Sequence, residues 1–175
     1  DIPPVGRVDV GGIALADVPA LLRVSAIPDE NPTELLRIYT PFAAYLSKEL
    51  GMPVRFTPVV DYAATVEGLS AGKLDLVWYG GFTSVQAVRR TNGTAKRLVL
   101  RQEDAEFKSV FIARPGSGPR SLADLKGKSF AFGSVSSTSG HLMPRYFLLQ
   151  AKVSPEKDMK QVAYSGAHDA TALWV

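Results

Sequence analysis

Short apolar runs alternate with segments of helical period along most of the chain. Residues 21–27 form a run rich in branched side chains, which predicts a strand, and residues 31–51 follow with apolar side chains at helical spacing. Gly51 predicts the C-terminal stop of that helix, and Pro41 predicts a kink within it. Residues 1–20 mix Pro, Gly and isolated apolar residues without either period, so we expect an irregular leader there.

The same strand-and-helix unit then recurs to the end of the chain. Its regularity predicts right-handed crossover connections and a largely parallel sheet. The expected strands are 53–60, 74–80, 96–102, 107–116, 129–135 and 161–166, and the expected helices are 61–72, 82–93, 121–128, 141–152 and one beginning at 168.

This order of elements predicts an α/β fold of two lobes with mainly parallel sheets. Residues 21–107 form the first α/β lobe, and residues 108–175 supply a crossover strand and an incomplete second α/β lobe. The last residues, ATALWV, are apolar and stop without a glycine, a basic last turn or a polar tail. We therefore expect the second lobe to be truncated inside an element.

Composition narrows the possible chemistry. The 175 residues are 46% hydrophobic and carry a net charge of +3, an ordinary globular balance that gives little support to nucleic-acid binding. The chain has no cysteine and two histidines, which excludes thiolate metal sites, iron–sulfur clusters and cysteine nucleophiles. We therefore expect no metal, no cofactor and no nucleic-acid partner. No apolar run reaches the roughly 18 residues that would predict a membrane-spanning helix.

Polar and small residues follow the predicted strands. Ligands of open parallel sheets bind outside the carboxyl ends of the strands, so these segments are where a site is expected. Each of them precedes the start of a helix, where Asp61 and Thr83 predict simple helix caps. The segments are Pro28–Asn31, Asp61–Tyr62, Tyr79–Gly81, Ser134–His141 and Ser165–Asp169.

The segment SVSSTSGH is the most specific of these. Four consecutive hydroxyl residues, Ser136–Ser139, and Gly140 stand at a predicted helix N-terminus, where backbone N–H groups lack partners within the helix. This arrangement predicts a cradle for an anion, in which Gly140 lets an oxyanion approach the backbone. The simpler interpretation is an ordinary helix cap, which needs only one hydroxyl. No lysine follows the glycine, so a nucleotide P-loop is disfavoured.

Two histidines and two tyrosines have open interpretations from the residues alone. His168 stands at a strand-to-helix corner beside Asp169, and His141 opens a helix directly behind the hydroxyl cluster, so each fits a binding role or a structural one. Tyr62 follows a predicted cap and can present its phenol to a crevice. Tyr79 precedes a pair of glycines that suits either a sharp turn or close approach of a ligand.

Three of these features together resemble a known family. The STSG run after a strand, the aromatic residue and glycine pair in VWYGG, and the His–Asp corner in YSGAHDA are similar to the periplasmic solute-binding proteins of phosphonate-type ABC importers and their phosphite, phosphate and selenate relatives. The resemblance covers roughly residues 21–175. It implies a periplasmic-binding-protein-like fold whose two lobes close on ligand like a hinged trap, an extracytoplasmic location, and importer membrane subunits as partners.

The resemblance also implies a function and a site between the lobes. The function is capture of a small tetrahedral oxyanion for an importer. Alternatives are a sensor that presents its closed form to a membrane kinase and an enzyme acting on a phosphorylated substrate, although the sequence shows no nucleophile paired with a base and no carboxylate pair. A binding protein, not an enzyme, is therefore expected. Its expected ligand-binding residues are Tyr62, Tyr79, Gly80, Ser136, Ser137, Thr138, Ser139, Gly140, His141, His168 and Asp169.

Overall fold

The computed structural model describes residues 20–175, so the leader expected at 1–20 lies outside the described residues except for its last one. The first half is a three-stranded parallel sheet of order β2-β1-β3. Its elements are β1 (Leu22–Ala26), α1 (Pro32–Leu50), β2 (Val54–Phe56), α2 (Tyr62–Ser70), β3 (Leu76–Trp78) and α3 (Gly81–Arg90). We call this half, together with the short η2 (Gln102–Glu106), lobe one.

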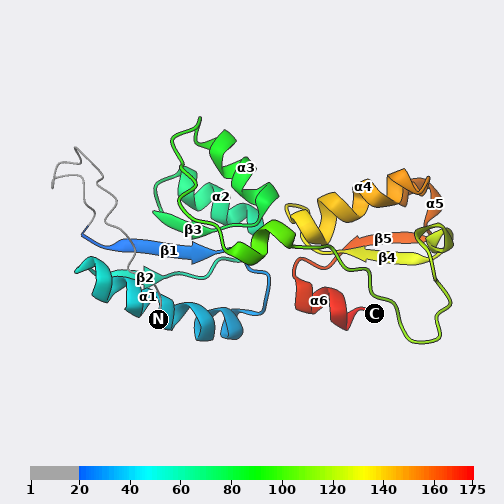
Figure 1. The fold of residues 1–175 in the computed structure, drawn as a ribbon, viewed down its shortest axis with the longest axis horizontal. Coiled ribbons are helices and arrows are strands. Elements are labelled where there is room, and N and C mark those ends of the chain that lie inside the picture. The colour runs from blue at the N-terminus through cyan, green and yellow to red at the C-terminus, as the bar shows by residue number, and fades with distance from the viewer. Residues whose placement is uncertain (1–19) are drawn as a thin grey trace.

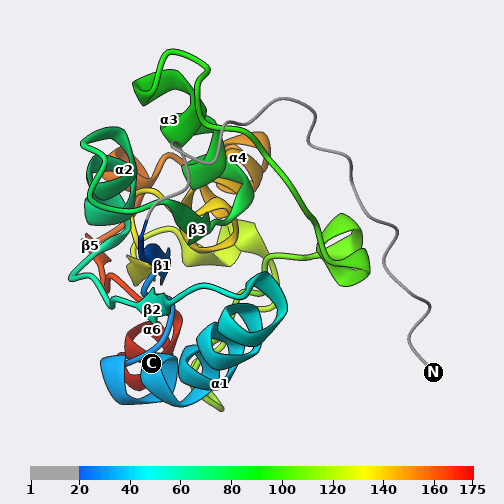
Figure 2. The same ribbon diagram turned by 90° about the vertical axis from the view of Figure 1, so that its left-hand side faces the viewer.

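Helices cover both faces of the sheet in lobe one. Helix α1 lies on one face, and α2 and α3 lie on the other (Figures 1 and 2). Asn31 caps α1 by accepting a hydrogen bond from the Glu34 N–H, and Gly51 ends the helix with a left-handed φ of 65°. Asp61 caps α2 in the same way, accepting from the Ala64 N–H at 2.7 Å, as the sequence predicted.

The second half contains a two-stranded parallel sheet, and we call it lobe two. Strands β4 and β5 pair from Ser129 with Gln161 to Phe132 with Tyr164. Helix α4 packs on one face of the sheet, and α6 lies on the other side (Figure 1). The elements are η3 (Leu122–Leu125), β4 (Ser129–Phe132), the π-helix η4 (Thr138–Leu142), α4 (Met143–Gln150), α5 (Pro155–Asp158), β5 (Gln161–Tyr164) and α6 (His168–Leu173). Both sheets are parallel, which confirms the predicted α/β class.

Two predicted strands are wrong. Residues 96–102 and 107–116 contain no strand, although their composition favours one. Leu98, Val99 and Leu100 are 73%, 78% and 75% exposed, and Phe107 is 65% exposed. A strand needs a partner to pair with, and none of the five strands in residues 20–175 pairs with these segments, although Phe111 packs against Phe130 of β4. Apolar composition indicates that a segment favours the β conformation, but it does not indicate whether another strand is available to pair with it.

The core of lobe two predicts a large stability effect from one substitution. Leu148 is fully buried with Phe132 and Val153. We expect Leu148→Ala to lower the free energy of unfolding by about 2–5 kcal/mol, because it leaves a cavity as well as losing apolar burial. The neighbouring Leu149→Ala is the matched control, since Leu149 is 52% exposed. Chemical denaturation measures both, and equal losses would contradict the assigned core.

No helix in the described part of the chain is long and apolar enough to cross a membrane.

Candidate functional site

The loop that follows β4 carries the hydroxyl cluster, and we call residues 134–140 the hydroxyl loop. Ser137 is 3% exposed, and its Oγ accepts a hydrogen bond from the Gly140 N–H at 2.9 Å. Ser137 is thus the cap of η4, the role for which only one hydroxyl is required. The remaining hydroxyls of the cluster are left for other partners.

Unpaired backbone donors lie at the start of the helical stretch that η4 and α4 form together. Thr138 and Ser139 are the first two residues of this stretch, which runs through residues 138–150. The hydrogen bonds of residues 20–175 include no acceptor for their two N–H groups, and none for the Ser139 hydroxyl. Helix N-termini concentrate positive potential and point their N–H groups outward, so this end of the stretch suits an anion.

Close backbone contact holds the hydroxyl loop against the end of β4. Pro144 has no N–H, so the Gly140 carbonyl four residues earlier is left free by the helix and accepts from the Gly133 N–H at 2.8 Å. A Cβ on Gly140 would lie 3.0 Å from the Ser137 Oγ and 3.3 Å from the Gly133 Cα. The close approach within the protein itself therefore favours glycine at position 140.

Lobe one contacts the hydroxyl loop through the beginning of α3. The Phe82 N–H donates to the Thr138 Oγ1 at 2.7 Å, and the Thr83 Oγ1 donates to the Ser136 carbonyl at 2.9 Å. The prediction that Thr83 caps its helix is wrong, because the N-cap position is held by Gly80. Thr83 is fully buried and faces the other lobe. A single sequence gives no signal for a contact 53 residues away.

Tyr62, His168 and Asp29 meet where the two lobes join. The His168 N–H donates to the Asp29 carbonyl at 2.9 Å and so links α6 to the segment after β1. Burial, followed by the charge of Asp29, raises the pKa of the Tyr62 phenol, while the Ser137 hydroxyl opposes the rise. The same two causes raise the pKa of Tyr39 to about 12. The structure thus brings Tyr62 and His168 to the hydroxyl loop and adds Asp29 beside them.

Asp29 carries a carboxyl group with an unusual environment. Burial raises its pKa above the ordinary value. A hydrogen bond from its own backbone N–H, and then the charges of His168 and Arg101, only partly oppose that effect, while Asp169 adds to it. The charge of Asp169 thus acts on this junction, while its Oδ1 accepts from the Ala170 N–H at 2.7 Å. Asp29 was visible in the sequence only as one member of a polar strand end.

Two residues expected in the site are engaged elsewhere. The Tyr79 phenol donates to the Thr65 carbonyl at 2.8 Å, inside lobe one. The His141 Nδ1 is 2.7 Å from the Val135 carbonyl, and its Nε2 accepts from the Arg145 Nε at 2.9 Å. The His141 ring also packs edge-on against Phe132. These contacts fit structural roles in each lobe, which is the alternative that the sequence left open for His141.

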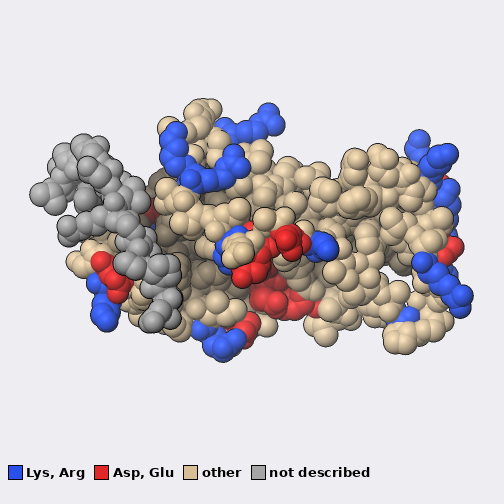
Figure 3. Space-filling view, in the orientation of Figure 1, with Lys and Arg blue, Asp and Glu red and all other residues tan. Residues whose placement is uncertain are grey.

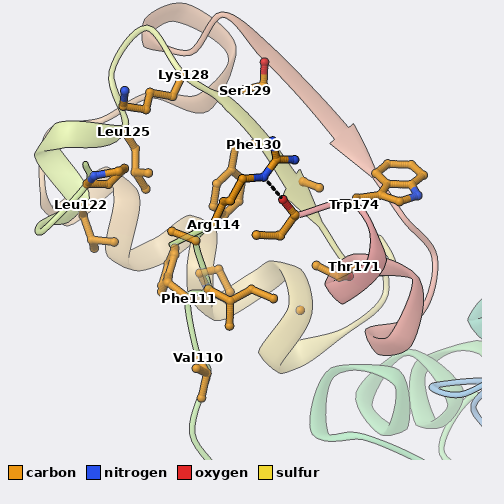
Figure 4. Close-up of a pocket in the computed structure, with 18 of the residues that line it drawn as sticks. Val110, Phe111, Arg114, Leu122, Leu125, Lys128, Ser129, Phe130, Thr171 and Trp174 are labelled. Atoms are coloured by element: carbon orange, nitrogen blue, oxygen red, sulfur yellow. Dashed lines mark hydrogen bonds between the residues drawn. The ribbon is translucent and has the colours of Figure 1, made fainter. Parts of the chain in front are cut away.

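A groove of about 1000 Å³ runs along lobe two between residues 107–114, β4 and α6. Its walls are mostly apolar, with Phe111, Leu122 and Phe130 turned into it (Figure 4). The Arg114 Nε donates to the Val175 carbonyl across it at 2.8 Å. Three predicted site residues, Ser139, Gly140 and His168, also line this groove. The groove also contains Lys108, Arg120 and Lys128, but the backbone donors of the hydroxyl loop lie only at this end.

The surface charge adds little to anion capture. Acidic side chains gather near the middle of one face, around η2, whereas many Lys and Arg side chains stand at its two ends (Figure 3). Residues 20–175 contain no cluster of three or more His, Asp or Glu side chains that could hold a metal ion. An anion at the hydroxyl loop would therefore be held by local N–H and O–H donors.

Asp29 predicts a specific pH dependence of stability. Its raised pKa means that the folded state binds the proton more tightly than the unfolded chain, so its stabilising contribution is present below the ordinary value of 3.8 and is lost as the pH rises through the raised pKa. We expect Asp29→Asn to melt above the wild type near neutral pH and to lose that advantage near pH 3.8.

The control for this experiment is a carboxyl group with the opposite shift. The pKa of Asp75 is lowered, chiefly by the hydrogen bond from the Arg23 side chain. Asp75→Asn should therefore melt below the wild type near neutral pH. Differential scanning calorimetry of both variants across this pH range makes the comparison. A lower melting temperature for Asp29→Asn at neutral pH would show that its ionised form is stabilised by contacts instead.

Paired parallel α/β lobes, with polar strand ends meeting at their junction, are the architecture of a two-lobed solute-binding protein. A family model for the periplasmic phosphonate substrate-binding proteins of ABC transporters matches residues 24–175. The chain therefore belongs to this family, which confirms the resemblance predicted from sequence. The members of the family are substrate-binding proteins of transporters.

Individual relatives agree with the family assignment. The probable ABC transporter phosphite binding protein PhnD1 of Prochlorococcus marinus (strain MIT 9301) is 42% identical over 164 residues, which cover 90% of this chain and 55% of that protein. The phosphate-import protein PhnD of Mycolicibacterium smegmatis (strain ATCC 700084 / mc(2)155) is 33% identical, over 89% of this chain and 51% of its own length. The chain thus spans about half the length of these relatives.

A solved structure has the same fold. The structure of PhnD1 from Prochlorococcus marinus in complex with methylphosphonate superimposes with a TM-score of 0.74 at 38% sequence identity. The match covers 87% of this chain and 58% of that one. The two-lobed α/β fold predicted from sequence is therefore confirmed.

Proposed function

We propose that this protein captures a small tetrahedral oxyanion of the phosphonate, phosphite or phosphate class at the junction of its lobes and delivers it to an ABC importer outside the cytoplasm. The observation that carries the proposal is the pair of N–H groups of Thr138 and Ser139, which, like the Ser139 hydroxyl next to them, have no partner within residues 20–175. Donors of this kind stabilise an anion without any titratable cation.

Each residue of the junction has a role in this proposal. The N–H groups of Thr138 and Ser139 and the Ser139 hydroxyl donate to the ligand oxygens. The His168 ring supplies a further donor, since no hydrogen bond within residues 20–175 uses it, and the Tyr62 phenol beside Ser137 supplies another. The lobes close over the ligand by a hinge motion, because a ligand that touches both lobes favours the closed arrangement.

The charge of Asp29 affects which ionic form of the ligand is preferred. Its carboxylate lies close enough to Tyr62 and Tyr39 to raise the pKa of each phenol. His168 in turn lies close enough to lower the pKa of Asp29. A fully ionised ligand would be repelled by this carboxylate, whereas a ligand that keeps a proton can donate it as a hydrogen bond. The names of the relatives support this range, since they include a phosphite binding protein, a phosphate-import protein and a complex with methylphosphonate.

Titration calorimetry tests the proposal directly. Methylphosphonate, phosphite, phosphate and sulfate are each added to the purified protein near neutral pH. We expect saturable one-to-one binding of at least one phosphorus oxyanion, with sulfate weaker because it carries no proton for Asp29. Absence of binding by all three phosphorus oxyanions, in protein with a cooperative unfolding transition, would contradict the proposed function.

A further inference from the structure

The beginning of α3 is completed by a residue of the other lobe. Its N-cap position is Gly80, which has no side chain to accept a hydrogen bond from the first turn of the helix. The Thr138 Oγ1 accepts that bond instead, from the Phe82 N–H at 2.7 Å. Thr138 therefore acts as the cap of a helix in lobe one while it belongs to the hydroxyl loop of lobe two.

A second bond joins the same two segments in the opposite direction. The Thr83 Oγ1 donates to the Ser136 carbonyl at 2.9 Å. Thr83 is fully buried, so its hydroxyl has no competing water. The two bonds hold the hydroxyl loop on either side of Ser137, the residue that caps η4.

Small residues permit this approach of the lobes. A Cβ on Gly81 would lie 3.5 Å from the Thr138 Oγ1, which is ordinary van der Waals contact, and Gly80 has similar space. A larger side chain at either position would lie between α3 and the hydroxyl loop. An added methyl group is therefore tolerated at both positions, and only a side chain longer than alanine would keep the lobes apart.

We propose that Thr83 and Thr138 form an interlobe latch and that Thr83 is a positioning residue for the oxyanion site. The latch uses only protein groups. It holds the Thr138 and Ser139 N–H groups in place for the ligand, so less of the binding energy is spent on ordering the loop and closing the lobes. The expected effect on oxyanion binding rests on the proposed function. The latch itself is a contact between the two lobes and does not depend on what the site binds.

Thr83 is the informative position because its buried side chain does not reach the ligand. Thr83→Val keeps the shape and removes the donor, and Thr83→Ser restores the donor without the methyl group. We expect Thr83→Val to weaken methylphosphonate binding about three- to tenfold, the effect of losing roughly one ordinary hydrogen bond. Thr83→Ser should bind within about twofold of the wild type. Ser84→Ala is the matched control, since the Ser84 hydroxyl bonds only within its own helix, to the Gly81 carbonyl at 2.8 Å.

A second measurement reports the latch without any ligand. The chain has no cysteine, so a Lys73→Cys, Lys157→Cys pair places one spin label on each lobe at exposed positions. We expect Thr83→Val to shift the interlobe distance distribution toward longer distances, and Thr83→Ser and Ser84→Ala to leave it unchanged. Thr138→Val, which removes the other bond, should cause the same shift and provides the test if Thr83→Val does not fold.

The outcomes separate the latch from the proposed function. If Thr83→Val and Thr138→Val both leave the distance distribution unchanged, or if Thr83→Ser is as damaging as Thr83→Val, the latch is wrong and Thr83 only fills space. If the wild type binds none of the oxyanions but the valine variants still lengthen the distance, the latch stands and the proposed function fails.

Discussion

Ser139→Ala is expected to weaken methylphosphonate binding roughly tenfold to hundredfold while the melting temperature stays close to that of the wild type. The Ser139 hydroxyl has no partner in residues 20–175, so its loss removes no bond of the folded protein. In the proposed complex it donates to a charged oxygen, a bond worth on the order of 1.5–3 kcal/mol. Calorimetric titration and thermal unfolding of the same preparation measure the two effects.

Ser137→Ala is the matched comparison for Ser139→Ala, two residues away in the same loop. Ser137 caps η4 through the Gly140 N–H, so its loss should cost about 1 kcal/mol of stability. If the hydroxyl loop had only a structural role, affinity for methylphosphonate would decrease in proportion to protein stability in both variants. Unchanged affinity in Ser139→Ala would remove the hydroxyl from the site and leave the backbone N–H groups as its main donors.

The sequence predicted the elements whose signals are local. Asp61 and Gly51 lie at ends of helices, where the residue type itself favours a cap or a stop. The helix behind the hydroxyl cluster and the parallel strands β4 and β5 also follow from short patterns. The four-residue helix α5 was missed, because its single turn is too short to establish a period.

The errors come from tertiary contacts that no pattern encodes. The segments 96–102 and 107–116 have strand composition but pair with none of the described strands. Tyr79 follows a strand as a ligand-binding residue would, yet its phenol bonds to the Thr65 carbonyl. Thr83 stands where a cap would be expected, yet its hydroxyl reaches the opposite lobe. In each case the residue type suggested a role, but the sequence did not show which partner the residue would contact.

The hydroxyl cluster shows both what a local sequence pattern predicts and what depends on tertiary contacts. Four consecutive hydroxyls predicted a cradle or a cap, and the structure contains a division of roles. Ser137 caps η4, Thr138 accepts a bond from lobe one, and Ser139 has a hydroxyl without a partner. Composition predicted that the cluster has more hydroxyls than a cap requires. The Ser136 hydroxyl, like that of Ser139, has no hydrogen-bond partner in residues 20–175, and only the fold shows which hydroxyls are spare.

Gly140→Ala should have the largest combined effect, lowering both stability and affinity for methylphosphonate. An added Cβ would lie 3.0 Å from the Ser137 Oγ and 3.3 Å from the Gly133 Cα, closer than folded proteins normally tolerate. The Gly133 Cα is backbone and cannot turn aside, so we expect the hydroxyl loop to shift from β4 by a few tenths of an ångström. That movement strains the Gly133 N–H bond to the Gly140 carbonyl and the Ser137 cap, and it displaces the adjacent N–H donors of the site.

Gly81→Ala is the control for Gly140→Ala, because it adds the same methyl group on the opposite side of the junction. Its Cβ would lie 3.5 Å from the Thr138 Oγ1, an ordinary contact, and alanine favours the first turn of α3. We expect Gly81→Ala to bind and melt like the wild type, and Gly140→Ala to lose at least tenfold in affinity, about 1.4 kcal/mol. Equal behaviour of the two variants would mean that the hydroxyl loop is pliable. An anion site at the start of η4 would then depend on ligand-induced order instead of the close packing of Gly133 against Gly140.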